Sequence, residues 1–149
     1  VAQALHWFDL PRFFAECTRV LTPGGMLLAW GYQDMVAPAG VDEALQPFRD
    51  AIAPYWPPER QLIDDAYRDF AWPYPRVDTP VLELTAAWTL PRMLGYFSSY
   101  SATKRYIDAH GRDPVAAHAD AIAAAWGDPA TVRTLRWPLF LHARRKATA

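Results

Sequence analysis

Residues 9–30, DLPRFFAECTRVLTPGGMLLAW, hold the elements that decide the fold. Apolar side chains recur every three to four positions through the first half of this stretch, which predicts an amphipathic helix with Asp9 as its N-cap. The TPGG sequence at 22–25 ends the helix and turns the chain. The continuous apolar run at 26–30 then predicts a strand that is buried on both faces. A helix, a glycine turn and a buried strand form half of a βαβ unit, so this stretch favours an α/β fold with a parallel sheet.

Helical periodicity returns in three later segments. Residues 41–69 predict two helices separated by a Trp-Pro-Pro break, and residues 90–110 predict a helical region that is broken in its middle. Asp113 followed by Pro114 predicts the start of a further helix, because Asp caps a helix N-terminus and Pro suits its first turn.

Two segments have the period-two alternation of strands. They are residues 81–88 and residues 132–145. Pro138 interrupts the second one, and since proline cannot donate to a sheet ladder, we expect it at a bulge, a strand entry or an edge, with local distortion.

Composition bounds the class of protein. The chain has 149 residues, of which 52% are hydrophobic and 21% charged, as in an ordinary globular domain. The formal net charge of −1, with scattered basic residues, gives no sign of a nucleic-acid or membrane partner. The single cysteine, Cys17, excludes an internal disulfide and is compatible with the cytoplasm. No apolar run approaches the ~20 residues of a membrane span.

Common catalytic motifs are absent. The chain has no paired-cysteine motif, His-Glu-x-x-His, Gly-x-Ser-x-Gly, Gly-x-Gly-x-x-Gly or Walker loop. The four histidines lack metal-ligand spacing, so we expect no metal site. For His110, His118 and His142 we expect ordinary structural roles.

The beginning of the chain resembles the class I S-adenosylmethionine-dependent methyltransferases. The resemblance rests on AQALHWFD at 2–9, a helix, RVLTPGG at 19–25, and a buried strand that ends Trp30-Gly31-Tyr32. Later motifs resemble the small-molecule branch that contains trans-aconitate methyltransferase-like enzymes. These motifs, in chain order, are Trp88-Thr89-Leu90, Gly95-Tyr96, Ser99-Tyr100-Ser101-Ala102 and Trp137-Pro138-Leu139.

The resemblance implies a fold and a cofactor. The fold is the C-terminal half of a Rossmann-like class I methyltransferase sheet, with strands 5, 6 and 7 and helices on both faces, in which the final strand lies antiparallel to the fifth. Residues 1–149 would form the C-terminal portion of a single domain, with a helical substrate cover over about 41–70 and 90–127. Such enzymes hold S-adenosylmethionine through a glycine-rich loop and an acidic residue, which this chain lacks. We therefore expect these parts to precede Val1, and the chain to be a piece of a longer protein.

The resemblance also implies site residues. Ala2, Gln3, Ala4 and Trp7 match the cofactor-facing segment, and His6 matches a position that could act as general base for an oxygen nucleophile. The alternative is that His6 and Trp7 only shape the pocket wall, because carboxylate substrates need no base. The substrate-facing residues would be His6, Trp7, Tyr32, Tyr96, Tyr100 and Ser101, and ordinary helix packing is an equally open role for the last three.

The full protein is accordingly expected to transfer a methyl group from S-adenosylmethionine to a small-molecule acceptor, and this piece to be inactive alone. The alternative function is a non-catalytic module that binds an apolar ligand or a partner through its aromatic residues. We also expect the strand at 26–32 to pair with the final strand on one side only. Its open edge would allow self-association.

Overall fold

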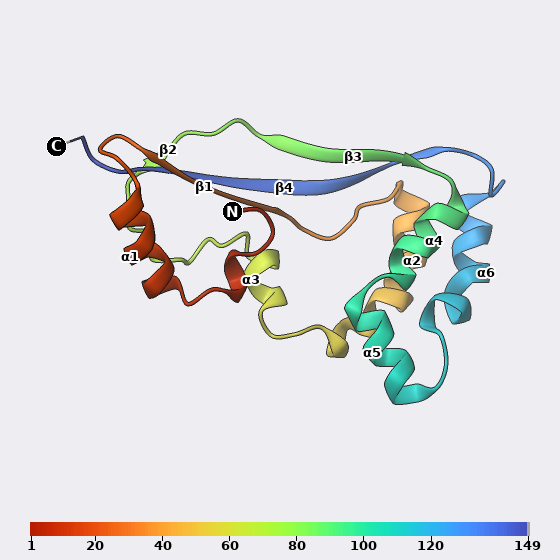
Figure 1. Cartoon of the computed structure of the whole chain (residues 1–149). Helices are drawn as coiled ribbons and strands as arrows, with labels where there is room; N and C mark the ends of the chain where they lie inside the picture. Colours follow the sequence, from red (N-terminus) through yellow and green to blue (C-terminus); the bar gives the residue numbers. More distant parts are fainter. Residues whose placement is uncertain (149) are drawn as a thin grey trace. The chain divides into compact units, whose positions relative to one another are not determined.

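The computed structural model describes residues 1–148, and its helices and strands are labelled in Figure 1. In chain order they are η1 (Leu5–Trp7), α1 (Leu10–Val20), β1 (Met26–Tyr32), α2 (Ala39–Ile52), η2 (Ala53–Tyr55), α3 (Arg60–Asp64), β2 (Arg76–Val77), β3 (Leu82–Trp88), α4 (Leu90–Ser98), α5 (Ser101–His110), α6 (Pro114–Trp126) and β4 (Arg133–Arg145). This is the mixed α/β fold that the sequence predicts.

The chain divides into two compact units. Unit 1 consists of Val1–Asp34, Glu59–Leu84 and the last strand from Trp137 onward, and unit 2 consists of Met35–Pro58 and Thr85–Arg136. That both units belong to one methyltransferase domain, and that the helices between 41–70 and 90–127 cover a substrate, stay predictions. Ala149, the last residue of the predicted domain, lies outside the described residues.

Local signals explain where the helices begin. Asp9 caps α1 by accepting a hydrogen bond from the backbone N–H of Arg12 at 3.1 Å, and Asp113 caps α6 in the same way from Val115 at 2.8 Å. Gly127 follows α6 with a positive φ of 81°, as expected of a residue that ends a helix. These predictions from the sequence are confirmed.

The helix predicted up to residue 69 is shorter than expected. α3 ends at Asp64, and the following turn contains Ala66 and Tyr67 with φ of 51° and 54°. Two consecutive left-handed residues cannot continue a right-handed helix. The boundary was missed because neither residue is a glycine, which is the usual signal for this conformation.

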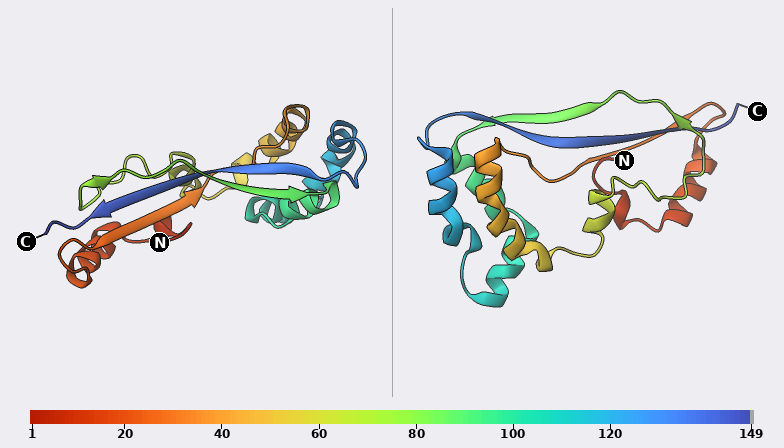
Figure 2. Two further views of the ribbon diagram at one scale, coloured as in Figure 1. Left: turned by 90° about the horizontal axis from the view of Figure 1, so that it is seen from above. Right: turned by 180° about the vertical axis from the view of Figure 1, so that it is seen from behind.

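Strand β4 lies at the centre of the sheet. It pairs antiparallel with β1, from Met26–Arg145 to Tyr32–Leu139, and antiparallel with β2 through Arg76–Arg144 and Val77–Ala143. β3 also pairs with β4. The arrows of β1 and β4 in Figure 2 point in opposite directions. The antiparallel position of the last strand is confirmed, but the expectation of a parallel sheet is wrong for these ladders, because β4 enters beside β1 from the opposite direction.

Pro138 stands where the ladder between β1 and β4 ends. The last paired residues are Tyr32 and Leu139, and the carbonyl oxygen of Pro138 accepts a hydrogen bond from the backbone N–H of Gln33 at 2.9 Å. β4 itself continues through the proline. The residue therefore lies at the end of one ladder, as the missing N–H requires, and the expected distortion does not interrupt the strand.

Strand β1 has one buried face and one exposed face. Leu27, Ala29 and Gly31 are buried, whereas Leu28 and Trp30 remain 46% and 39% exposed. The prediction that this strand is buried on both faces is wrong. A run of apolar residues does not reveal which face a helix covers, and in unit 1 the helices α1 and α3 lie on one side of β1 (Figure 1).

Each unit has its own apolar core. In unit 1 the helices pack on the buried face of β1 through two clusters, whose buried members are Leu5, Ala29, Ile63 and Tyr67 in one and Phe14, Cys17, Leu27 and Tyr74 in the other. In unit 2 the helices pack around Phe48 and Phe97, whose ring centroids lie 5.0 Å apart. None of the helices formed by residues 1–148 combines the length and the apolar character needed to cross a membrane.

Candidate functional site

The first three residues lie along the free edge of β1. Ala2 forms a parallel bridge with Trp30, the backbone N–H of Gln3 donates to the Trp30 carbonyl oxygen at 2.8 Å, and the Trp30 N–H donates to the Val1 carbonyl oxygen at 3.0 Å. The expectation that residues 26–32 pair on one side only is therefore wrong at this point. The bridge places the predicted cofactor-facing segment beside the middle of β1.

Gln3 connects this segment to Tyr32, so two of the predicted site residues are in contact. Its side-chain Oε1 accepts from the Tyr32 N–H at 2.8 Å, and its Nε2 donates to the Tyr32 carbonyl oxygen at 3.2 Å. Gln3 has a φ of 47°, a left-handed conformation that costs about 1–2 kcal/mol for a residue other than glycine. The paired amide hydrogen bonds help to offset that cost and fix the turn into η1.

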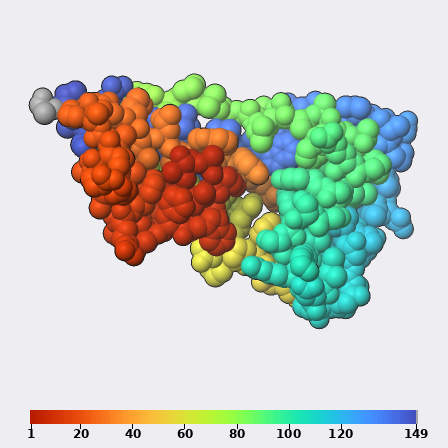
Figure 3. All heavy atoms as spheres, viewed as in Figure 1, coloured from red at the N-terminus to blue at the C-terminus, as the bar shows by residue number. Residues whose placement is uncertain are grey.

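His6 and Trp7 form the polar and aromatic part of the segment. The His6 Nδ1 lies 2.7 Å from the hydroxyl oxygen of Tyr67, and its ring centroid lies 4.6 Å from that of Trp7. Trp7 is 58% exposed, an unusual position for so large an apolar side chain. Figure 3 shows the first residues, in dark red, at the surface of unit 1. The predicted segment is thus accessible.

The environment of His6 favours its neutral form. Burial lowers the pKa of His6, Arg60 lowers it further, and Glu59 acts in the opposite direction. Burial also raises the pKa of Tyr67, against a smaller effect of backbone hydrogen bonds from His6 and Leu5. Two arrangements satisfy the contact between His6 and Tyr67. If the Tyr67 hydroxyl donates to Nδ1, the imidazole proton lies on Nε2, which is then a donor; if Nδ1 donates to the hydroxyl oxygen, Nε2 is free to act as a base.

The predicted residues of unit 2 form an aromatic group. The ring centroids of Tyr96 and Tyr100 lie 5.0 Å apart, with Trp88 at 5.2 Å from Tyr96 and Trp56 at 5.2 Å from Tyr100. Ser101 is the exposed first residue of α5. These residues belong to another unit than Gln3, His6, Trp7 and Tyr32. That the two sets line one substrate site stays a prediction.

Tyr67 is the residue of the site that the sequence did not indicate. It is 1% exposed and lies 61 positions from its hydrogen-bond partner His6. No periodicity or motif marks it, since its placement depends on the left-handed turn after α3. The Asp64-Asp65 pair just before it was expected to be solvated. Asp65 is half-buried and Asp64 exposed, and each pairs with a neighbouring arginine.

The side chain of each of the other three histidines has a hydrogen-bond partner of its own. His118 Nδ1 lies 2.8 Å from the carbonyl oxygen of Pro114, and His142 Nε2 lies 2.7 Å from that of Ala66. His110 bonds to the hydroxyl group of Tyr55. Among residues 1–148, no group of three or more His, Cys, Asp or Glu side chains has the arrangement of a metal site.

Comparison with known proteins gives two similarities, whereas no family model matches the chain. A protein named "Putative methyltransferase" from Dictyostelium discoideum is 34% identical over 117 residues, which are 76% of this chain and 44% of that protein. The solved structure of a "Putative Type II Methyltransferase" from Anaeromyxobacter dehalogenans is 36% identical, with a TM-score of 0.91 over 99% of this chain and 63% of that one.

Both of these proteins are named as methyltransferases, the kind of enzyme that the motifs between residues 2 and 32 resemble. The chain spans less than two thirds of either relative. Neither relative is named for the trans-aconitate branch.

Proposed function

We propose that this chain is part of an enzyme that transfers a methyl group from S-adenosylmethionine to a small-molecule acceptor. The observation that carries the proposal is the similarity to the Anaeromyxobacter protein, with 36% identity and a TM-score of 0.91 over 99% of the chain. The backbone similarity extends over 99% of the chain, so the resemblance is not limited to the Pro-Gly-Gly turn.

Residues 2–7 suit the cofactor only in part. The exposed ring of Trp7 offers a flat apolar surface of the kind that packs against a ligand, and Ala2 is exposed while Ala4 is half-buried. The chain has no glycine-rich loop for the rest of such a ligand. We therefore propose that Ala2, Gln3, Ala4 and Trp7 contribute one side of the cofactor site, and that residues 1–149 alone are inactive.

The cofactor supplies an activated methyl group, so the protein has chiefly to position the acceptor. Within this proposal His6, held by Tyr67, donates a hydrogen bond from Nε2 to the acceptor and orients it. Action of His6 as a general base requires the other tautomer, with the proton on Nδ1. Tyr32 and, in unit 2, Tyr96, Tyr100 and Ser101 would face the acceptor. The trans-aconitate-like branch and a cytoplasmic location, which the free and buried Cys17 fits, are parts of the same proposal.

The second candidate is a non-catalytic module that binds an apolar ligand. The aromatic group of Trp56, Trp88, Tyr96 and Tyr100 in unit 2 favours it, since such clusters also line apolar binding sites. The two candidates differ in the ligand. A methyltransferase binds S-adenosylmethionine with micromolar affinity, whereas this module binds it no better than adenosine.

The test is calorimetric titration of S-adenosylmethionine into the product of the complete reading frame that contains residues 1–149. We expect micromolar binding that Trp7→Ala weakens at least tenfold, about 1.4 kcal/mol. Phe8→Ala is the matched control, because Phe8 is also exposed but packs on Phe13 at 5.1 Å. Equal affinities of Trp7→Ala and Phe8→Ala would show that the cofactor does not bind at residues 2–7. No binding to the unmodified protein would overturn the proposed function.

A further inference from the structure

Two arginines stand directly opposite each other at the edge of unit 1. Arg76 of β2 and Arg144 of β4 are cross-strand partners in the ladder. Like charges in this position destabilise a sheet pair. Within residues 1–148, neither guanidinium forms an ion pair with a carboxylate. The fold therefore holds two positive charges at facing positions, and no carboxylate of the described residues pairs with either.

Arg144 is the more constrained of the two. Its guanidinium carbon lies 4.9 Å from the centre of the Trp72 ring, and its Nε is buried without a hydrogen-bond partner. Burial lowers the pKa of Arg144, and the charge of Arg76 adds to that effect. An arginine keeps its proton in spite of such a shift, so a buried donor and an uncompensated charge remain. Each is costly unless an acceptor is supplied.

The ring of Trp72 under Arg144 is itself stacked on His142. The ring of His142 lies on Trp72 with centroids 4.8 Å apart and an angle of 24°, and His142 Nε2 is fixed by the Ala66 carbonyl oxygen at 2.7 Å. The Nε1 of Trp72 is a second buried donor without a partner. A guanidinium held on a fixed aromatic stack loses little conformational entropy when it binds an anion.

Arg144 and His142, but not Trp72, line a hollow of about 570 Å³ on unit 1, the size of a site for a small molecule. Arg76, Arg144, His142 and Thr79 lie on its walls, together with Asp64 and Asp65. The two acidic side chains already pair with Arg60 and Arg68, at 3.0 Å and 3.7 Å. Their charges are therefore compensated, whereas those of Arg76 and Arg144 are not.

We propose that this hollow is an oxyanion-binding site, in which the carboxylate or phosphate group of a small molecule binds between the guanidiniums of Arg76 and Arg144. Planar guanidiniums bind such groups through paired, charge-assisted hydrogen bonds. The bound group would separate the two positive charges and supply an acceptor to Arg144. None of the residues assigned to cofactor or acceptor takes part, so the site does not rest on the proposed methyl transfer.

Equilibrium dialysis of the 149-residue chain against ³²P-labelled phosphate and ¹⁴C-labelled succinate tests the site, at ionic strength held constant with sodium chloride. We expect saturable binding of at least one probe with a dissociation constant below about 1 mM. This limit corresponds to a binding free energy of about −4 kcal/mol. Phosphate alone would identify a phosphate site, and succinate alone a carboxylate site. Binding of neither probe would overturn the proposal.

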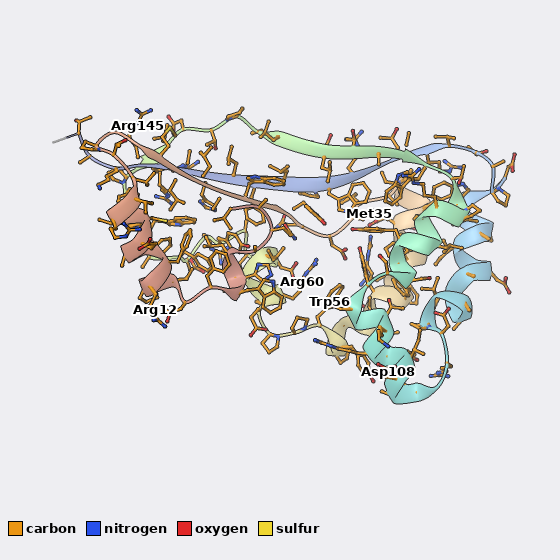
Figure 4. All side chains as sticks on the ribbon, in the orientation of Figure 1. Arg12, Met35, Trp56, Arg60, Asp108 and Arg145 are labelled. Carbon is orange, nitrogen blue, oxygen red and sulfur yellow. The ribbon has the colours of Figure 1, made fainter. Side chains whose placement is uncertain are left out.

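Three variants separate the site from general attraction to positive charge. Arg76→Gln should weaken binding at least tenfold. Arg76→Lys keeps the positive charge but lacks the paired N–H donors of the guanidinium, and it should bind with intermediate affinity. Arg12→Gln is the control, because Arg12 lies at the end of α1 away from the strands (Figure 4). In chloride alone, Arg76→Gln should also be slightly more stable than the unmodified chain, as the repulsion is removed. Equal binding by Arg76→Gln and Arg12→Gln would overturn the proposal.

Discussion

At the scale of single residues, three residues other than glycine within the described range 1–148 have a left-handed backbone conformation, and all lie near the candidate site. They are Gln3, Ala66 and Tyr67, with φ of 47°, 51° and 54°. Each such conformation costs of order 1–3 kcal/mol, and it persists only where the surroundings impose it. Here Gln3 is held by Tyr32, the Ala66 carbonyl oxygen accepts from His142, and Tyr67 bonds to His6. The strain thus accompanies the contacts that fix the candidate site.

Tyr67→Phe tests which partner donates in the bond to His6. If Tyr67 donates to Nδ1, it stabilises the neutral imidazole, and its removal should raise the pKa of His6 toward the ordinary value of 6.5. Stability should fall by about 1 kcal/mol. Because the folded-state pKa of His6 lies below its unfolded value, its contribution is present above pH 6.5 and is lost as the pH falls through the folded-state pKa. The variant should lose less stability on acidification.

Titration of the histidine NMR signals measures this effect, with His6→Gln to assign the resonance. Tyr74→Phe is a matched control, since the Tyr74 hydroxyl bonds to Thr18 at 2.8 Å and not to a histidine. A further decrease of the His6 pKa in Tyr67→Phe would show that Nδ1 is the donor. Nε2 would then be free to act as a base.

At the scale of elements, a glycine in a strand and a glycine in a helix differ in how much space a side chain would have. Gly31 lies in β1, where an added Cβ would come within 2.6 Å of both the Gln3 Oε1 and the Phe140 ring. Gly95 lies in α4, where an added Cβ would meet nothing within 4 Å. The close approach of the N-terminal segment and β4 to β1 therefore depends on the missing side chain of Gly31.

We predict that Gly31→Ala lowers the free energy of unfolding by about 1–3 kcal/mol, because the strand is overpacked. Gly95→Ala should instead raise it by up to about 1 kcal/mol, since alanine favours the helix. Urea unfolding of the two variants beside the unmodified chain measures both changes. A neutral Gly31→Ala would mean that Gln3 and Phe140 can move away, and that the segment before η1 is loosely held.

At the scale of the whole molecule, the exposed face of β1 bears on whether the chain associates with itself. Met26, Leu28 and Trp30 form an apolar row on it, with exposures of 37%, 46% and 39%. The other edge of the same strand is bonded by residues 1–3 at Leu28, Trp30 and Tyr32. The exposed apolar face is therefore the part of β1 that can promote association between chains.

We therefore propose that the 149-residue chain associates with itself in solution, and that Leu28→Lys weakens this association about tenfold, ~1.4 kcal/mol. Val20→Lys is the control, because Val20 is 55% exposed on α1, away from the strand. Light scattering over a concentration series, with a hydrophobic dye, measures the effect. A dye-silent monomer at high concentration would contradict the proposal and favour a self-contained binding module.

The sequence by itself determined what short-range chemistry controls. The start of α1 at Asp9, the start of α6 at Asp113 and the alternation of β4 all depend on side chains and backbone groups within about four positions of each other. The Pro-Gly-Gly turn and its neighbours likewise indicated the family, because such a motif is local.

Tertiary structure alone decided which face of β1 is covered, the register of β1 on β4, and that His6 meets Tyr67. Each of these depends on partners far apart along the chain, such as Met26 with Arg145 in the ladder. The local pattern is the same whichever segment arrives as the neighbour, so it cannot select that neighbour. The pairing of Arg76 with Arg144 follows the same rule. It exists only because the register of β2 on β4 sets the two residues opposite each other.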